Sequence, residues 1–79
     1  LFPQVLKNAV VQRKVPIETV APVQNVLQEV GKRLGDKGRV LVRYSGTEPL
    51  ARVMVEGEDQ ELISQACDEL VAIVTKELG

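Results

Sequence analysis

The strongest constraint on the fold is a pair of β-rich runs in the middle of the chain, separated by a short polar loop. Residues 39–44 read RVLVRY and residues 52–56 read RVMVE. In the second run, Val53 and Val55 face one way and their neighbours the other, which is the period-two pattern of a strand with one buried face. Two strands joined by a short loop, residues 45–51, predict an antiparallel hairpin. This hairpin needs other elements to cover its apolar face.

Two amphipathic segments can supply that cover. Pro22 opens the first, because its missing N–H costs nothing in the first turn of a helix. Apolar residues then recur at helical spacing as far as Leu34, and Gly35 is a typical C-terminal stop. After Asp59, a plausible N-cap, a second apolar face runs close to the end of the chain. Cys67 lies on that face and is interpreted as a core residue rather than a nucleophile.

A further β-rich run precedes these elements, over residues 4–11. A connection follows over residues 12–21, in which Pro16 breaks regular structure, although residues 10–18 have room for another short strand. The order is therefore strand, helix, strand, strand, helix. It predicts a single α+β domain over residues 1–79, with a small, mainly antiparallel sheet and two helices on one face.

Composition argues against several classes of function. The net charge is −1, with one tyrosine, one phenylalanine and no tryptophan, whereas nucleic-acid binders rely on basic patches and stacking rings. The absence of histidine removes histidine-based triads and most zinc sites. A single cysteine allows no internal disulfide and indicates a reducing, cytoplasmic location. No apolar run approaches the length of a membrane span.

The loop and its flanks carry the candidate chemistry. Gly46 allows a sharp turn and a close ligand approach, and successive backbone N–H groups in such a turn can hold an anion. Ser45 and Thr47 add hydroxyl donors. Arg43 ends the incoming strand and Arg52 begins the outgoing one, so the hairpin places them side by side. Two guanidinium groups in that position have the fork geometry that fits phosphate, and a phosphate site is predicted here.

A structural interpretation of the same residues stays open at this point. Ser-Gly-Thr is an ordinary turn sequence, and hairpin ends often carry arginine. Arg43 could pair with Glu48, and Arg52 with Glu56 or with a helix carboxylate. Neither the P-loop nor the dinucleotide glycine fingerprint is present.

The segment from Gly38 to Gly57, GRVLVRYSGTEPLARVMVEG, resembles the phosphate-binding segment of the α-D-phosphohexomutases. It is nearest to the bacterial phosphoglucosamine mutase branch of that family. The resemblance extends outward to residues 2–8 and to the C-terminal helix, so it covers nearly the whole chain. Tyr44 departs from the proline common in that branch, and Ala51 replaces a larger apolar residue.

The resemblance implies the fourth, C-terminal domain of a four-domain enzyme, with a fold like that of the TATA-binding protein. Its loop would hold the substrate phosphate that is not reacting. By motif position the contacts would be Arg43, Ser45, Gly46, Thr47 and Arg52. The implied reaction is an intramolecular phosphoryl transfer between glucosamine 6-phosphate and glucosamine 1-phosphate. It passes through a hexosamine 1,6-bisphosphate and uses a phosphoserine and Mg²⁺.

This chain carries neither the phosphoserine loop nor the aspartate-rich metal loop. The resemblance therefore implies no catalytic residue and no metal ligand here, and we expect the fragment alone to be inactive. Because the chain begins at Leu1 without Met, we expect it to be part of a longer protein or a processed product. The expected partners are the sugar phosphate and the other domains of the parent chain, with no nucleic acid and no membrane. Two alternatives stay open: the same domain of a phosphoglucomutase or phosphomannomutase, and a free-standing α+β binding module.

Overall fold

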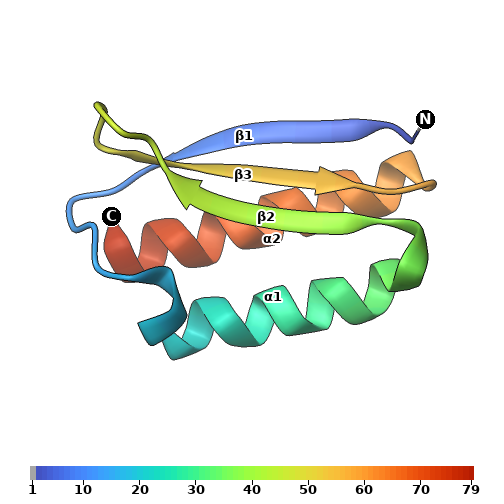
Figure 1. The fold of residues 1–79 in the computed structure, drawn as a ribbon, viewed down its shortest axis with the longest axis horizontal. Helices are drawn as coiled ribbons and strands as arrows, with labels where there is room; N and C mark the ends of the chain where they lie inside the picture. Colours follow the sequence, from blue (N-terminus) through green and yellow to red (C-terminus); the bar gives the residue numbers. More distant parts are fainter. Residues whose placement is uncertain (1) are drawn as a thin grey trace.

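The computed structural model describes residues 2–79, which form a three-stranded sheet with two helices on one face (Figure 1). The elements in chain order are strand β1 (Gln4–Val10), 3₁₀ helix η1 (Ile17–Thr19), helix α1 (Ala21–Leu34), 3₁₀ helix η2 (Gly35–Lys37), strands β2 (Arg39–Tyr44) and β3 (Leu50–Glu56), and helix α2 (Gln60–Leu78). The strand order is β1–β3–β2, and both pairs are antiparallel. The predicted α+β class and layout are confirmed.

The core lies between the sheet and the two helices. β3 is the central strand, and its Val53 and Val55 side chains are fully buried, as the alternation predicts. Val30 of α1 and Leu70 of α2 pack into the same cluster. Cys67 belongs to this cluster and is 0% exposed, which confirms its interpretation as a core residue.

The helix boundaries follow the capping signals. Asp59 is the N-cap of α2, and its carboxylate accepts a hydrogen bond from the Leu62 backbone N–H at 3.2 Å. Gly35 closes α1 with a φ of 62°, a left-handed conformation that glycine adopts without strain. α1 begins at Ala21 rather than at Pro22, and the proline still lies in its first turn.

The prediction of a further short strand within residues 10–18 is wrong. The backbone here bonds to the end of α2 instead of to a strand, because the N–H groups of Gln12 and Arg13 both donate to the Leu78 carbonyl, at 2.7 and 3.3 Å. These donors are therefore not available to a sheet ladder. Residues 11–16 form a strap across one end of the molecule, and we call this segment the strap.

The sheet face turned away from the helices has no other element of residues 2–79 packed on it (Figure 1). The register gives this outer face three cross-strand rows: Gln4–Glu56–Arg39, Leu6–Met54–Leu41 and Asn8–Arg52–Arg43. The third row lies next to the β2–β3 loop. Figure 1 shows this loop (yellow-green) rising above the sheet on the side away from the helices, at the end where the C-terminus lies.

Candidate functional site

Arg43 of β2 and Arg52 of β3 lie directly opposite each other in the antiparallel register. Directly opposed residues project to the same face, with Cβ atoms about 4.5–5.5 Å apart. Both residues are exposed. Their predicted adjacency is therefore confirmed, and the two arginine side chains leave the same outer face from directly opposed positions beside the loop.

Neither arginine of this pair forms an ion pair with a carboxylate of residues 2–79. Arg43 therefore does not form the ion pair with Glu48 that was one of the alternatives. Glu56, the alternative partner of Arg52, instead accepts a hydrogen bond from Gln4 at 2.9 Å and lies 3.8 Å from the Arg39 Nε atom. The interpretation of the arginines as structural ion pairs is therefore wrong. Like charges directly opposite each other repel, so an anion between them would stabilise the pair.

Ser45 shapes the loop, which spans residues 45–49 because β3 begins earlier than predicted. Its N–H donates to the Leu50 carbonyl at 2.9 Å. Its hydroxyl oxygen accepts from the N–H groups of Thr47 and Glu48, at 3.5 and 3.3 Å. Both contacts exceed the usual range of roughly 2.7–3.2 Å, so these two N–H groups keep most of their capacity for a stronger acceptor.

Gly46 leaves open space beside the loop. No atom lies within 4 Å of a Cβ placed on it, and its φ lies outside the left-handed region, so neither packing nor backbone conformation requires a glycine. Gly46 is exposed, and its N–H donates no hydrogen bond to residues 2–79. A glycine that the fold does not need, with a free N–H, fits the close approach of a ligand.

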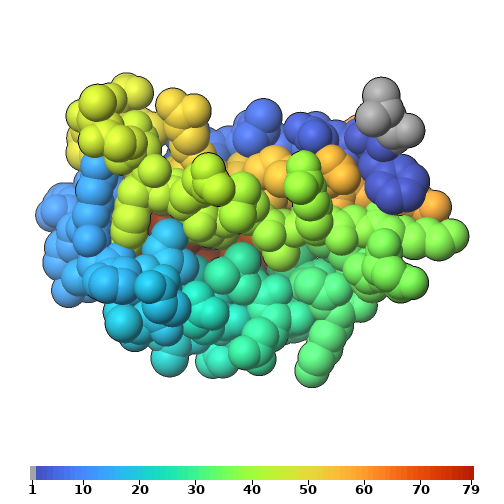
Figure 2. All heavy atoms as spheres, in the orientation of Figure 1, coloured from blue at the N-terminus to red at the C-terminus, as the bar shows by residue number. Residues whose placement is uncertain are grey.

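The strap is joined to the loop and to the end of β2 by hydrogen bonds. The Lys14 Nζ atom donates to the Ser45 carbonyl at 2.8 Å, and the Tyr44 hydroxyl donates to the Val15 carbonyl. Burial raises the pKa of the Tyr44 phenol, which keeps it protonated as a donor. In the space-filling view the loop forms a raised block (yellow-green) next to the atoms of the strap (Figure 2). Nothing in the local sequence signals this contact of Lys14, whose partner lies 31 residues away along the chain.

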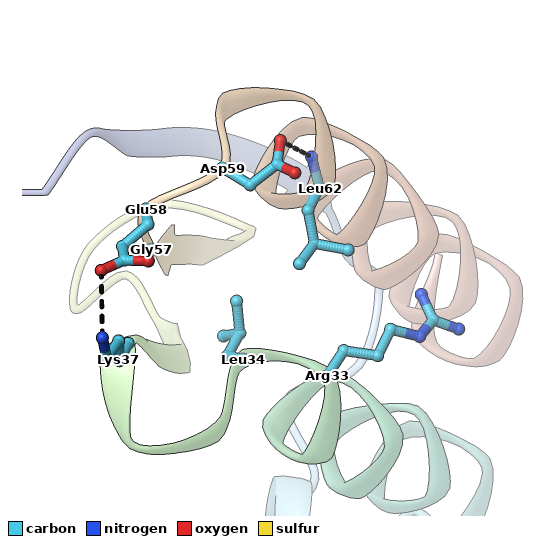
Figure 3. A pocket seen from close by; sticks show the side chains of 7 residues that line it. All are labelled: Arg33, Leu34, Lys37, Gly57, Glu58, Asp59 and Leu62. Carbon is cyan, nitrogen blue, oxygen red and sulfur yellow. Dashed lines mark hydrogen bonds and ion pairs between the residues drawn. The ribbon is translucent and has the colours of Figure 1, made fainter.

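A hollow of about 180 Å³ lies at the opposite end of β3, between the end of α1 and the start of α2 (Figure 3). Its charged groups are already paired. Lys37 lies 3.7 Å from Glu58, and Arg33 contacts Glu69 at 2.6 Å. None of the predicted site residues lines it. The candidate site is therefore the open surface at the loop, where the unpaired guanidinium groups stand.

Two kinds of feature are missing from the part of the chain that the structure describes. No three acidic or cysteine side chains there come together as a possible metal site. None of its helices combines the length and the apolar character needed to cross a bilayer.

Residues 6–73 match the family model described as phosphoglucomutase/phosphomannomutase, C-terminal domain. A phosphoglucosamine mutase of Nitratidesulfovibrio vulgaris is 51% identical over 78 residues, which are 99% of this chain and 17% of that protein. A phosphoglucosamine mutase of Chlamydia trachomatis is 49% identical over 77 residues, 98% of this chain and 17% of that protein. A third, from Lawsonia intracellularis, is 49% identical over the whole chain and 18% of its own length.

A solved structure shares the fold. It is a crystal structure of an Aspergillus fumigatus N-acetylphosphoglucosamine mutase variant in complex with glucose 1,6-bisphosphate, with a TM-score of 0.79 and 23% identity over 95% of this chain and 15% of that one. The chain thus spans less than a fifth of the length of these relatives. Because the family model matches most of its residues, the chain belongs to the family of phosphoglucomutase/phosphomannomutase C-terminal domains.

Proposed function

We propose that this chain is the substrate-phosphate-binding domain of a phosphoglucosamine mutase. Such an enzyme is an intramolecular phosphotransferase of the isomerase class that interconverts glucosamine 6-phosphate and glucosamine 1-phosphate. The observation that carries the proposal is the pair Arg43 and Arg52, which is adjacent, exposed and without a carboxylate partner in residues 2–79. The names of relatives about 50% identical to the chain support the amino-sugar substrate.

The phosphate would be held from two sides. The proposed contacts are Arg43, Ser45, Gly46, Thr47 and Arg52. The guanidinium groups would approach from the sheet, while the free Gly46 N–H and the two hydroxyl groups, that of the buried Ser45 and that of Thr47, would approach from the loop. Each hydrogen bond to a charged group contributes roughly 1.5–3 kcal/mol. Several of them together outweigh the entropy lost on association.

The domain would act by positioning the phosphate that does not react. Holding this remote group would also favour closure of the active site and the exclusion of water. The phosphoserine and Mg²⁺ of the proposed reaction would be held by other parts of the parent, since residues 2–79 bring no set of metal ligands together. The hexosamine 1,6-bisphosphate would bind the same loop as the substrate. The proposal places the enzyme in the cytoplasm and makes the isolated chain inactive.

The test is the variant Arg52→Ala in the full-length parent enzyme. We expect its KM for glucosamine 6-phosphate to rise about tenfold or more, with a matching loss of kcat/KM, because a charge-assisted contact is removed. Arg39→Ala is the matched control, since it removes the same charge from the far end of the same face. We expect its KM to stay within about twofold of wild type, because its exposed ion pair contributes little. An unchanged KM in Arg52→Ala would contradict the proposed function.

A phosphoglucomutase or phosphomannomutase parent is the second candidate, because the matched family model is named for those two enzymes. The phosphate site would be the same in either case, since it contacts the phosphate and not the sugar. Measurement of kcat/KM for glucosamine, glucose and mannose phosphates on the parent distinguishes the candidates. A clear preference for glucose or mannose phosphate would replace the first candidate by the second.

A further inference from the structure

We infer that Lys14 is a positioning residue of the phosphate site and acts through the peptide group that joins Ser45 to Gly46. The inference rests on the proposed function, because it adds a residue to the same site. Lys14 comes from the strap, outside the loop motif, and its ammonium group makes the loop a better anion binder without being one of the five proposed contacts.

The first observation is the direction of the Lys14 charge. Its Nζ atom donates to the Ser45 carbonyl oxygen at 2.8 Å. No carboxylate of residues 2–79 lies within ion-pair distance of it. The positive charge of Lys14 is therefore directed at one peptide group at the base of the loop.

The second observation is what lies on the other side of that peptide group. No peptide bond in residues 2–79 is cis, and in a trans peptide the C=O and N–H groups point in opposite directions. With Lys14 on the oxygen, the Gly46 N–H points away from Lys14. It belongs to the residue that has open space beside it and no hydrogen-bond partner in residues 2–79.

A cation on the carbonyl oxygen polarises the whole peptide group. Hydrogen bonds in a chain strengthen one another by this polarisation, so the Gly46 N–H becomes a stronger donor to a phosphate oxygen. The same contact neutralises the partial negative charge of the Ser45 carbonyl, which would otherwise repel an anion near the loop. Lys14 therefore improves the site electrostatically.

The strap is a firm support for this contact. The Arg13 guanidinium donates to the Glu77 carbonyl at 2.8 Å, which ties the strap to the end of α2. The Val11 N–H donates to the Pro49 carbonyl at 2.9 Å, which ties the strap to the far end of the loop. Because these contacts do not involve Lys14, the loop keeps its attachment when the Lys14 charge is removed.

The test uses the full-length parent with the variant Lys14→Met, which keeps the length of the side chain and removes the charge. We expect KM for glucosamine 6-phosphate to rise about three- to tenfold, with kcat within about twofold of wild type, since part of one charged contact is lost. Lys14→Arg, which still presents a cationic donor, should restore KM to near the wild-type value. Lys32→Met, on an exposed position of α1, is the control for the loss of one positive charge.

The outcomes separate this inference from the proposed function. If Arg52→Ala weakens binding and Lys14→Met leaves KM unchanged, the role of Lys14 is overturned and the phosphate site stands. If neither variant changes KM, both the role of Lys14 and the proposed function are overturned. An equal rise of KM in Lys14→Met and Lys32→Met overturns the inference, because overall charge then explains the effect.

A second variant keeps the test decisive if Lys14→Met does not fold. Lys14→Gln removes the charge but keeps a polar side chain, which is one bond shorter than that of lysine. We expect its KM to lie about twofold or more above wild type, because the polarising charge is gone. A KM equal to that of wild type would show that the charge has no role and would overturn the inference.

Discussion

Gly38 and Gly46 show two opposite reasons for a glycine. A Cβ on Gly38 would overlap the Glu56 carbonyl oxygen and lie 3.1 Å from the Leu34 Cβ atom, so the close approach of backbone at the end of β3 requires glycine there. A Cβ on Gly46 would meet nothing within 4 Å. No residue of the described chain explains the second glycine, whereas the proposed phosphate would.

Gly46→Ala is therefore expected to leave the fold intact and weaken binding. The free energy of unfolding of the 79-residue chain, measured by urea titration, should change by less than about 0.5 kcal/mol. KM of the parent for its sugar phosphate should rise severalfold, because the methyl group stands where the ligand approaches. Gly38→Ala is the control with the reverse pattern and should lose roughly 1–3 kcal/mol of stability through overpacking. Equal KM values for Gly46→Ala and wild type would show that the open space serves no ligand.

The two kinds of site residue differ in how far the sequence predicts them. The adjacency of Arg43 and Arg52 was predictable from the hairpin, because antiparallel pairing brings the two strand ends that flank the loop together. The contact of Lys14 with Ser45 depends on the path of the strap, which the bonds of Gln12 to the end of α2 determine. Long-range hydrogen bonds of this kind leave no periodic pattern in a sequence.

At the scale of elements, α2 depends on its N-cap because its first turn exposes backbone N–H groups without intrahelical partners. Asp59 satisfies that of Leu62. We expect Asp59→Ala to lower the free energy of unfolding by about 1 kcal/mol, and Asp59→Asn to change it by only a few tenths, because asparagine is an equally good cap. Urea unfolding of the three chains checks this. Similar losses in both variants would show that the charge of Asp59, and not its capping bond, stabilises the helix.

The elements themselves were largely predictable, and their arrangement was less so. Periodicity located both helices and the hairpin, since each has one apolar face. The central position of β3 was not predicted. It results from the pairing of β1 with β3, two strands that are separated in the sequence by α1 and β2. The error over residues 10–18 has a similar origin. This segment contains β-rich residues, but its backbone N–H groups bond to the end of α2 instead of to a strand.

At the scale of the whole molecule, the single buried thiol makes the stability of the fold depend on pH. Burial raises the pKa of the Cys67 thiol above its ordinary value. The unfolded chain therefore releases this proton at a lower pH than the folded chain does. The thiol contributes its stability fully below the ordinary thiol pKa, and that contribution is lost as pH rises through the folded value.

We accordingly expect the free energy of unfolding to fall more steeply above about pH 8.5 in the wild-type chain than in Cys67→Ala. The raised pKa of Tyr44 is common to both proteins and cancels in the comparison. The raised pKa of Lys7 comes mainly from its hydrogen bond to Asp68 and the charge of Asp68, which both proteins keep, and Cys67 is the smallest of its causes. The measurement is urea unfolding of both chains at several pH values between neutral and alkaline. Parallel curves would contradict a desolvated thiol in the folded state.

The alternation along β3 also separates two tasks that a domain of this size must perform. Positions facing the helices hold the structure together, while the positions between them, including Arg52, face outward beside the loop. A substitution at one set leaves the other set untouched. The side chains of the outer surface can therefore change while the interior, and with it the folding of the domain, remains the same.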